Sequence, residues 1–190
     1  MKKINDIRIL IIGILIFLAS YRLDKQASLF FRNFRFIPLD FVFSIITNFS
    51  FVVLIMLIIP IVILFNKNKK QTHLLLLAFA VSIISSFVLK LIFLRQRPNE
   101  LLTYPFINIT DYSFPSMHAA VIFSLLPILI KHLPKQKYFW IIFAFLVSFT
   151  RIYFGFHFLS DVVFGALLGY FIGNYFLRMF EKKKYGYKKI

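Results

Sequence analysis

The sequence predicts an all-α, polytopic membrane protein with six transmembrane helices. The first observation is composition: of the 190 residues, 60% are hydrophobic and 16% are charged, which is more apolar side chain than a soluble domain of this length can bury. The second is that six stretches lack Asp, Glu, Lys and Arg, where a span needs about 20 residues. The third is that the basic residues gather in alternate connecting segments.

The six predicted spans follow one another without a linker, repeat or low-complexity segment, so we expect a single domain over residues 1–190. The uncharged stretches are 9–21, 41–66, 71–89, 112–130, 138–150 and 162–177. Three of them are short, and we expect flanking Arg and Lys side chains to reach the interface from their ends.

The first span follows a basic segment and therefore has some features of a secretory signal. Because no small-x-small cleavage site comes after it, we expect a retained helix. The next segment, Arg22 to Asp40, contains SLFFRNFRF, a mixture of Phe and Arg. This segment predicts either an interfacial helix lying along the membrane or a loop with aromatic anchors.

Most of the 23 Lys and Arg residues fall in segments that are cytoplasmic if the amino terminus is inside. The positive-inside rule therefore predicts that both termini lie in the cytoplasm. The net charge of +16 is mainly a topological signal, helped by attraction of the basic tail to anionic lipid. Charges spread over short loops argue against nucleic-acid binding, and the absence of cysteine excludes disulfides and thiolate metal sites.

Polar groups at membrane depth are costly, so each one predicts a partner or a task. Seven of them fall at the predicted outer ends of helices 3 to 6, which places a candidate active site there. They are Lys90, Arg97, Ser116, His118, Arg151, His157 and Asp161. On a continuous helix, Lys90 and Arg97 would share one face. Pro115 suits a first helical turn, and Ser160 is placed to cap the last span.

This set predicts a phosphate site. It contains three cations, two histidines, a carboxylate and a hydroxyl, beside two helix amino termini that favour anions. Arg presents a planar fork to phosphate oxygens, and Lys supplies a point charge. One imidazole can attack phosphorus while the carboxylate fixes its tautomer, and the other can donate a proton to the leaving oxygen.

In order and spacing, three motifs resemble the signatures of the type 2 phosphatidic acid phosphatase (PAP2) superfamily. They are Lys90-x6-Arg97-Pro98, Pro115-Ser116-Met117-His118 and Thr150-Arg151-x5-His157-x3-Asp161. Members are integral-membrane lipid phosphatases related to vanadium haloperoxidases and bacterial acid phosphatases. The chain departs from the usual pattern at Met117, where the family has Gly, and at Thr150, where it has Ser. A backbone angle that only glycine tolerates therefore cannot be essential at position 117, and the thioether could narrow the entrance.

The resemblance implies a role for each of the seven residues. His157 is the nucleophile that forms a phosphohistidine, Asp161 orients and activates it, and His118 is the general acid. The phosphate is bound by Lys90, Arg97 and Arg151, with Ser116 adding a hydroxyl. The family uses no metal or other cofactor, and three cations would themselves repel a metal ion.

The expected protein is a phosphatase of a bacterial cytoplasmic membrane, with its active site facing the periplasm and a membrane lipid phosphate as its substrate. We favour lipid A 1-phosphate narrowly, over undecaprenyl pyrophosphate and phosphatidylglycerol phosphate. A lipid phosphotransferase is an alternative, and a non-enzymatic lipid carrier is a third hypothesis. Nothing in the sequence predicts an oligomeric state.

Several other polar residues are predicted to lie outside the site. His73 and His132 fall on the cytoplasmic side and cannot reach it. Arg95 lies inside the first motif but off its signature positions, and we interpret it as an interface anchor, with contact to a substrate headgroup as the alternative. Glu100 and Asp111 are interpreted as solvated, although either could pair with Arg95.

Overall fold

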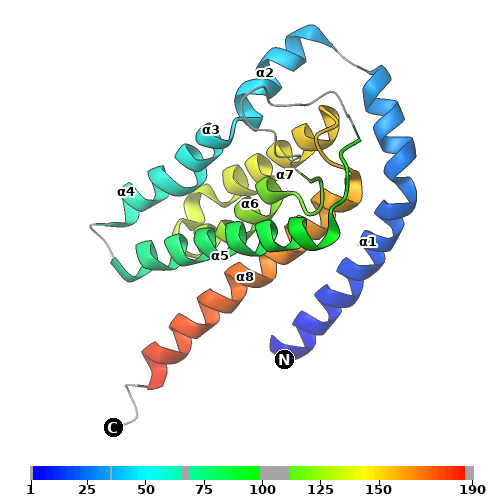
Figure 1. Ribbon diagram of the computed structural model, residues 1–190. Coiled ribbons are helices and arrows are strands. Elements are labelled where there is room, and N and C mark those ends of the chain that lie inside the picture. The colour runs from blue at the N-terminus through cyan, green and yellow to red at the C-terminus, as the bar shows by residue number, and fades with distance from the viewer. Residues whose placement is uncertain (1, 35, 66–68, 99–111, 187–190) are drawn as a thin grey trace.

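The computed structural model describes residues 2–34, 36–65, 69–98 and 112–186. Within these ranges every regular element is helical, which confirms the all-α prediction (Figure 1). The helices are α1 (Lys2–Asn33), α2 (Ile37–Thr47), α3 (Phe49–Val53), a π-helical turn (Leu54–Ile58), α4 (Ile59–Phe65), α5 (Lys69–Phe93), α6 (Met117–His132), a 3-10 turn (Pro134–Gln136), α7 (Lys137–Tyr153) and α8 (Leu159–Gly186).

Two helices in the described part are long and apolar enough to cross a membrane alone, Lys69–Phe93 and Leu159–Glu181. The pair Ile37–Thr47 and Phe49–Phe65 forms a third candidate span that is bent by 55° at its break. The count of six spans stays a prediction. The predicted span 41–66 is not one regular helix, because the chain leaves helical geometry at Asn48.

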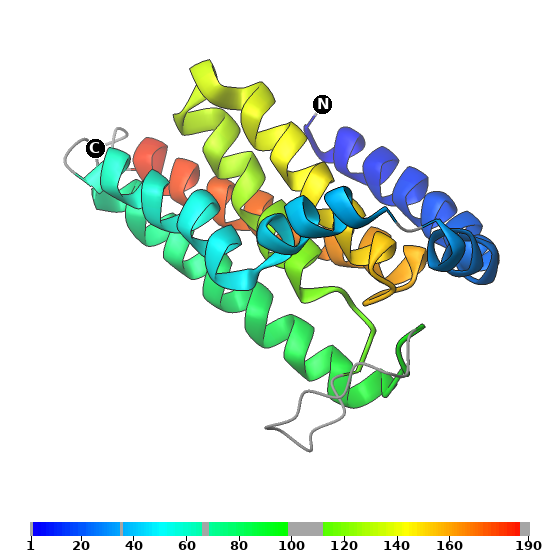
Figure 2. The same ribbon diagram turned by 90° about the horizontal axis from the view of Figure 1, so that it is seen from above.

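Helix α6 is the centre of the bundle, between α5, α7 and α8 (Figures 1 and 2). Most of its residues from Ala119 to Leu129 are buried. Its closest neighbour is α8, whose Gly165, Gly169 and Gly173 recur every four residues along one face. A Cβ atom at Gly169 would overlap the carbonyl oxygen of Ala120. The two backbones therefore pack directly on one another, as small residues allow in membrane helices.

Helix α1 continues well past the predicted first span and ends at Asn33. The SLFFRN part of the segment interpreted as an interfacial helix or loop is thus the end of α1. Residues 14–33 contain no Gly or Pro, the two residues that disfavour a helix most. Arg22 and Lys25 are good helix formers, so the helix continues through them. Helix α1 packs along α8.

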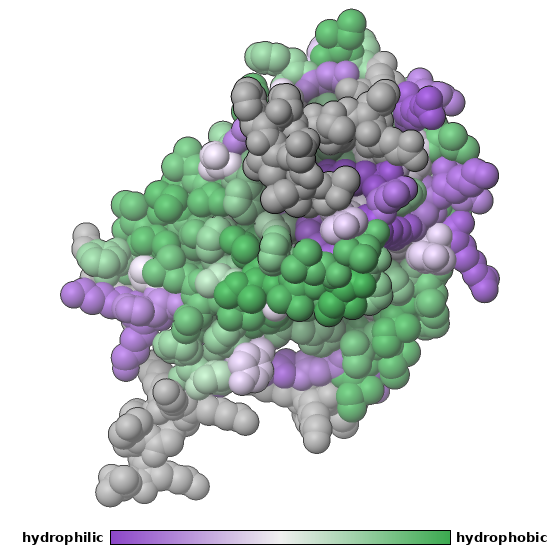
Figure 3. Space-filling model, viewed as in Figure 1, coloured by the Kyte–Doolittle hydropathy of each residue, from purple (hydrophilic) through white to green (hydrophobic). Residues whose placement is uncertain are grey.

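The outer surface of the bundle is largely apolar. Exposed Leu, Ile and Phe side chains lie on α1, α4, α5 and α7. In the view of Figure 3, hydrophobic residues cover the middle of the molecule, and many of the hydrophilic residues gather toward its upper right. Exposed apolar area on this scale marks an interaction surface, which in a chain of this composition is the bilayer.

Candidate active site

The first motif lies where α5 ends. The helix stops at Phe93, and Leu94 takes a positive φ of 47° while its N–H donates to the carbonyl of Lys90 at 3.0 Å. This left-handed residue ends the helix in the way that glycine usually does. Lys90 and Arg97 therefore do not share one helix face, as their spacing predicted, because Arg97 lies beyond the helix.

Both cations of this motif nevertheless reach the same end of the bundle. The buried ammonium of Lys90 donates to the carbonyl of Tyr112. The guanidinium of Arg97 donates to the carbonyl of Phe156 at 3.2 Å, in the turn between α7 and α8.

The second motif forms the start of α6. Ser116 is the N-cap residue, so Pro115 precedes the helix instead of opening it. The Ser116 N–H donates to the carbonyl of Asp161 at 3.0 Å. Its fully buried hydroxyl has no hydrogen-bond partner among the described residues, which is the condition expected of a group that awaits a ligand. Met117 is the first residue of α6 and has helical backbone, so no glycine is needed there.

The third motif joins the end of α7 to the start of α8 through a tight turn. Gly155 has a φ of 68°, and the carbonyl of Arg151 accepts from the N–H groups of Phe156 and His157 at 3.0 and 3.2 Å. The Arg151 guanidinium lies over the ring of Phe156, 4.2 Å from its centroid. Gly155 thus lets the chain fold back and bring His157 beside Arg151.

A backbone carbonyl holds the ring of His157. Its Nδ1 lies 2.6 Å from the carbonyl oxygen of Ser113. Because a carbonyl can only accept, Nδ1 must carry a proton, and in the neutral ring Nε2 is then the nitrogen with a lone pair. The Oδ2 atom of Asp161 is 3.9 Å from Nδ1, so Asp161 does not orient His157 by a direct hydrogen bond.

Asp161 is instead linked to His157 through Ser113. The Ser113 hydroxyl donates to Asp161 Oδ2, and the same oxygen accepts from the N–H of Phe158 at 2.8 Å. Asp161 is the third residue of α8, so this second bond caps the helix from inside. The predicted cap, Ser160, lies within α8 and does not have that role.

One charged residue beside the site, Asp24, was not predicted from the sequence, and the interpretation of Arg95 as an interface anchor is wrong. The Arg95 guanidinium donates to Asp161 Oδ1 at 2.6 Å and to Asp24 Oδ2 at 2.7 Å. Asp24, buried on α1, also accepts from the N–H and hydroxyl of Ser160 at 2.9 and 2.6 Å. Glu100 and Asp111, the other suggested partners of Arg95, lie outside the described residues.

A second residue that was not predicted from the sequence is Thr47, at the end of α2. Its hydroxyl accepts from the Arg151 guanidinium at 2.7 Å, and its carbonyl oxygen lies 3.0 Å from Nε2 of His118. The apolar stretch around it gave no sign of this, because a Thr in a span reads as an ordinary packing residue.

The local electrostatics favour a neutral His157. Burial lowers its pKa well below the usual value, and the positive charges of Arg151, Lys90 and Arg97 lower it further. The contacts described above bring all seven predicted residues to one end of the bundle. The described residues contain no group of three or more His, Asp and Glu side chains able to hold a metal ion; metal independence stays a prediction.

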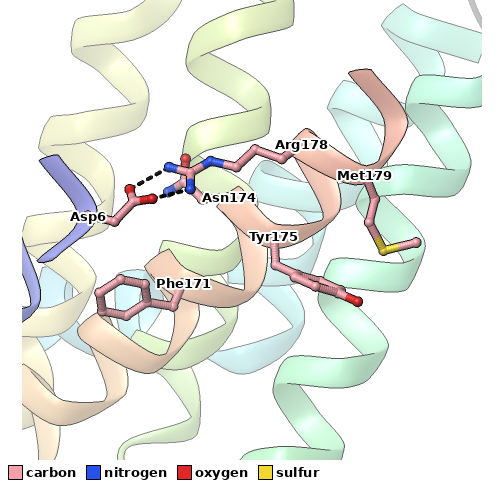
Figure 4. A pocket seen from close by; sticks show the side chains of 6 residues that line it. All are labelled: Asp6, Phe171, Asn174, Tyr175, Arg178 and Met179. Atoms are coloured by element: carbon pink, nitrogen blue, oxygen red, sulfur yellow. Dashed lines mark hydrogen bonds and ion pairs between the residues drawn. The ribbon is translucent and has the colours of Figure 1, made fainter. Parts of the chain in front are cut away.

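A pocket elsewhere on the molecule contains none of these residues. It lies between α1 and α8 and is lined by Asp6, Phe171, Asn174, Tyr175, Arg178 and Met179, with Arg178 paired to Asp6 (Figure 4). Arg178 follows Asp161 by 17 residues on α8, which is about 26 Å along a helix axis. The pocket therefore belongs to the opposite end of the bundle.

Comparisons with known proteins agree with the motif resemblance. The family model described as the PAP2 superfamily matches residues 71–185. Undecaprenyl-diphosphatase of Sulfolobus acidocaldarius is 32% identical over 118 residues, 59% of this chain and 56% of that protein. Phosphatidylglycerophosphatase B of Bacillus subtilis is 34% identical over 131 residues, 63% of each chain. The matches thus span less than two thirds of these curated relatives.

Two solved structures share the fold over most of its length. The transmembrane PAP2 type phosphatidylglycerolphosphate phosphatase from Bacillus subtilis superposes with a TM-score of 0.70 at 27% identity, covering 90% of this chain and 96% of that one. Aquifex aeolicus LpxE superposes with a TM-score of 0.67 at 29% identity, covering 82% of this chain and 95% of that one.

Proposed function

The chain belongs to the PAP2 superfamily, and from this membership we propose that it is a lipid phosphatase, working through a phosphohistidine on His157. The observation that carries the proposal is the hydrogen bond from His157 Nδ1 to the Ser113 carbonyl at 2.6 Å. In the neutral ring, which burial and the charges of Lys90, Arg97 and Arg151 favour, this bond leaves Nε2 unprotonated. A buried, neutral imidazole among cations suits attack on a phosphate.

In the first step, Nε2 of His157 attacks phosphorus. A nitrogen–phosphorus bond forms while the bond from phosphorus to the leaving oxygen breaks. His118 gives that oxygen a proton, so the leaving group departs as a lipid alcohol, or as a lipid monophosphate when the substrate is a diphosphate. Lys90, Arg97 and Arg151 offset the charge on the transferred group, which is the main demand of phosphoryl transfer.

In the second step, water attacks the phosphohistidine. His118, now neutral, takes the proton from the water as the nitrogen–phosphorus bond breaks. Inorganic phosphate leaves, and both histidines return to their starting protonation states. The Ser116 hydroxyl, which has no partner in the described part of the chain, would donate to a phosphate oxygen in both steps.

The substrate is a lipid phosphate or diphosphate whose chains stay in the bilayer. The names of the relatives cover an undecaprenyl diphosphatase, a phosphatidylglycerophosphatase and LpxE. They support these alternatives equally, so the preference for lipid A 1-phosphate drawn from the sequence has no further support. We place the site at the periplasmic face of a bacterial cytoplasmic membrane, on the distribution of Lys and Arg.

The test is phosphate release by the purified protein from undecaprenyl pyrophosphate, phosphatidylglycerol phosphate and lipid A, each with and without EDTA. We expect release from at least one lipid that EDTA does not reduce, and loss of that release in His157→Gln. The matched control is His73→Gln, because His73 is exposed and lies near the start of α5.

Rapid denaturation during turnover with labelled substrate should trap an acid-labile, base-stable protein adduct that His157→Gln lacks. Full activity of His157→Gln would remove the nucleophile from the proposal. Labelled acceptor lipid without inorganic phosphate would identify a phosphotransferase instead.

A further inference from the structure

The second candidate span is broken beside the site. Asn48 leaves helical geometry, with φ −61° and ψ 125°, and the helices on either side differ in direction by 55°. In an unbroken helix the N–H of Phe51 would donate to the carbonyl of Thr47. Here it donates to the side-chain Oδ1 of Asn48 at 3.2 Å. Asn48 therefore caps α3 and leaves the Thr47 carbonyl without its helical partner.

Two catalytic-site residues use the groups that the break supplies. The Thr47 carbonyl oxygen lies 3.0 Å from Nε2 of His118, and the Thr47 hydroxyl accepts from Arg151 at 2.7 Å. The ring of Phe49, just after the break, contacts the His118 ring edge to face at 5.0 Å between centroids. Irregular backbone at membrane depth persists only where protein or a water-filled cavity provides hydrogen-bond partners for its polar groups. Here His118 provides the partner of the Thr47 carbonyl.

The hydrogen bond to Thr47 also decides which nitrogen of His118 can work as an acid. A carbonyl accepts only, so Nε2 keeps a proton directed at Thr47. Nδ1 is then the nitrogen that exchanges a proton with the leaving oxygen. His157 shows the opposite assignment, with Nδ1 held by a carbonyl, so the two rings present different nitrogens to the substrate.

We propose that the break at Thr47 and Asn48 is a working part of the active site, in which Thr47 positions His118 through its carbonyl and Arg151 through its hydroxyl. Thr47 and Asn48 are positioning residues, since neither needs to touch the substrate. The proposal rests on the phosphatase function above.

Asn48→Ala removes the cap and offers the Phe51 N–H to the Thr47 carbonyl again. Asn48 is exposed, so the change leaves no cavity in the core. We expect kcat on a lipid phosphate to fall about 10- to 100-fold, part of what general acid catalysis contributes. Asn48→Ser keeps a residue able to cap and should retain most of the rate.

The leaving group separates positioning of the acid from general damage. A lipid-like aryl phosphate leaves as a stable phenolate and needs little proton donation. Asn48→Ala should therefore lose much less rate on the aryl phosphate than on the alkyl phosphate. Equal losses on both substrates would show that the break only supports the fold, and wild-type rates on both would refute the inference.

Thr47→Val tests the second contact, because it removes the hydroxyl while keeping the carbonyl and the side-chain shape. Losing a hydrogen bond to a charged group should lower kcat/KM about tenfold, equally for alkyl and aryl phosphates. Thr47→Ser should restore most of it. Thr47→Val at the wild-type kcat/KM would overturn this half of the inference. If the wild-type protein releases phosphate from none of these substrates, the proposed function fails first.

Discussion

Replacing Arg95 with Met would remove a guanidinium that bridges two buried carboxylates. Asp24 and Asp161 are 5% and 0% exposed, and Arg95 donates to them at 2.7 and 2.6 Å. Removing one partner of a buried ion pair costs about 3–5 kcal/mol. Because the Arg95 side chain is 24% exposed, we take the lower end, about 3 kcal/mol. At about 2–4 °C per kcal/mol for a chain of this size, Tm should fall by roughly 6–12 °C.

The assay is thermal unfolding of the purified protein in detergent, with Arg22→Met as the control, since Arg22 is exposed on α1. Adding Asp24→Asn to Arg95→Met removes one uncompensated charge, while the amide oxygen can still accept from Ser160. The double variant should therefore be less destabilised than the sum of the single variants, by about 1–3 kcal/mol. Strict additivity, or a wild-type Tm for Arg95→Met, would refute the charge argument.

Two further predictions concern helix packing and pH. Gly169→Ala should destabilise the protein by about 1–3 kcal/mol in thermal unfolding, because the new Cβ would overlap the Ala120 backbone. Gly13→Ala should destabilise it less, because the new Cβ would meet only the flexible end of the Leu167 side chain. Since burial and nearby cations lower the pKa of His157, the acid limb of kcat/KM should lie below about pH 6.5. Arg97→Gln removes a positive charge, raises that pKa and should move the acid limb to higher pH; an unmoved limb would contradict its assignment to His157.

The polar residues at the ends of the apolar stretches were enough to single out the seven motif residues as a candidate site, and their catalytic roles stay a prediction. Charges at membrane depth are rare, so Lys90, Arg151 and Asp161 stood out against their neighbours. Local geometry was predicted less well. The spacing of Lys90 and Arg97 suggested one continuous helix, but Leu94 ends α5 with a positive φ. Arg95, the next residue, is paired with Asp24 and Asp161, on two other helices.

By itself, the sequence determined the helical content, the membrane character and the chemical inventory of the site, because composition and motif spacing are properties of the chain. Only the tertiary structure decided which groups hold that inventory in place. Arg95 meets Asp24 across 71 residues, and Arg151 meets Thr47 across 104. Such pairs arise because α1 packs against α8 and α2 packs against α7, and hydrophobic periodicity carries no information on which helices become neighbours.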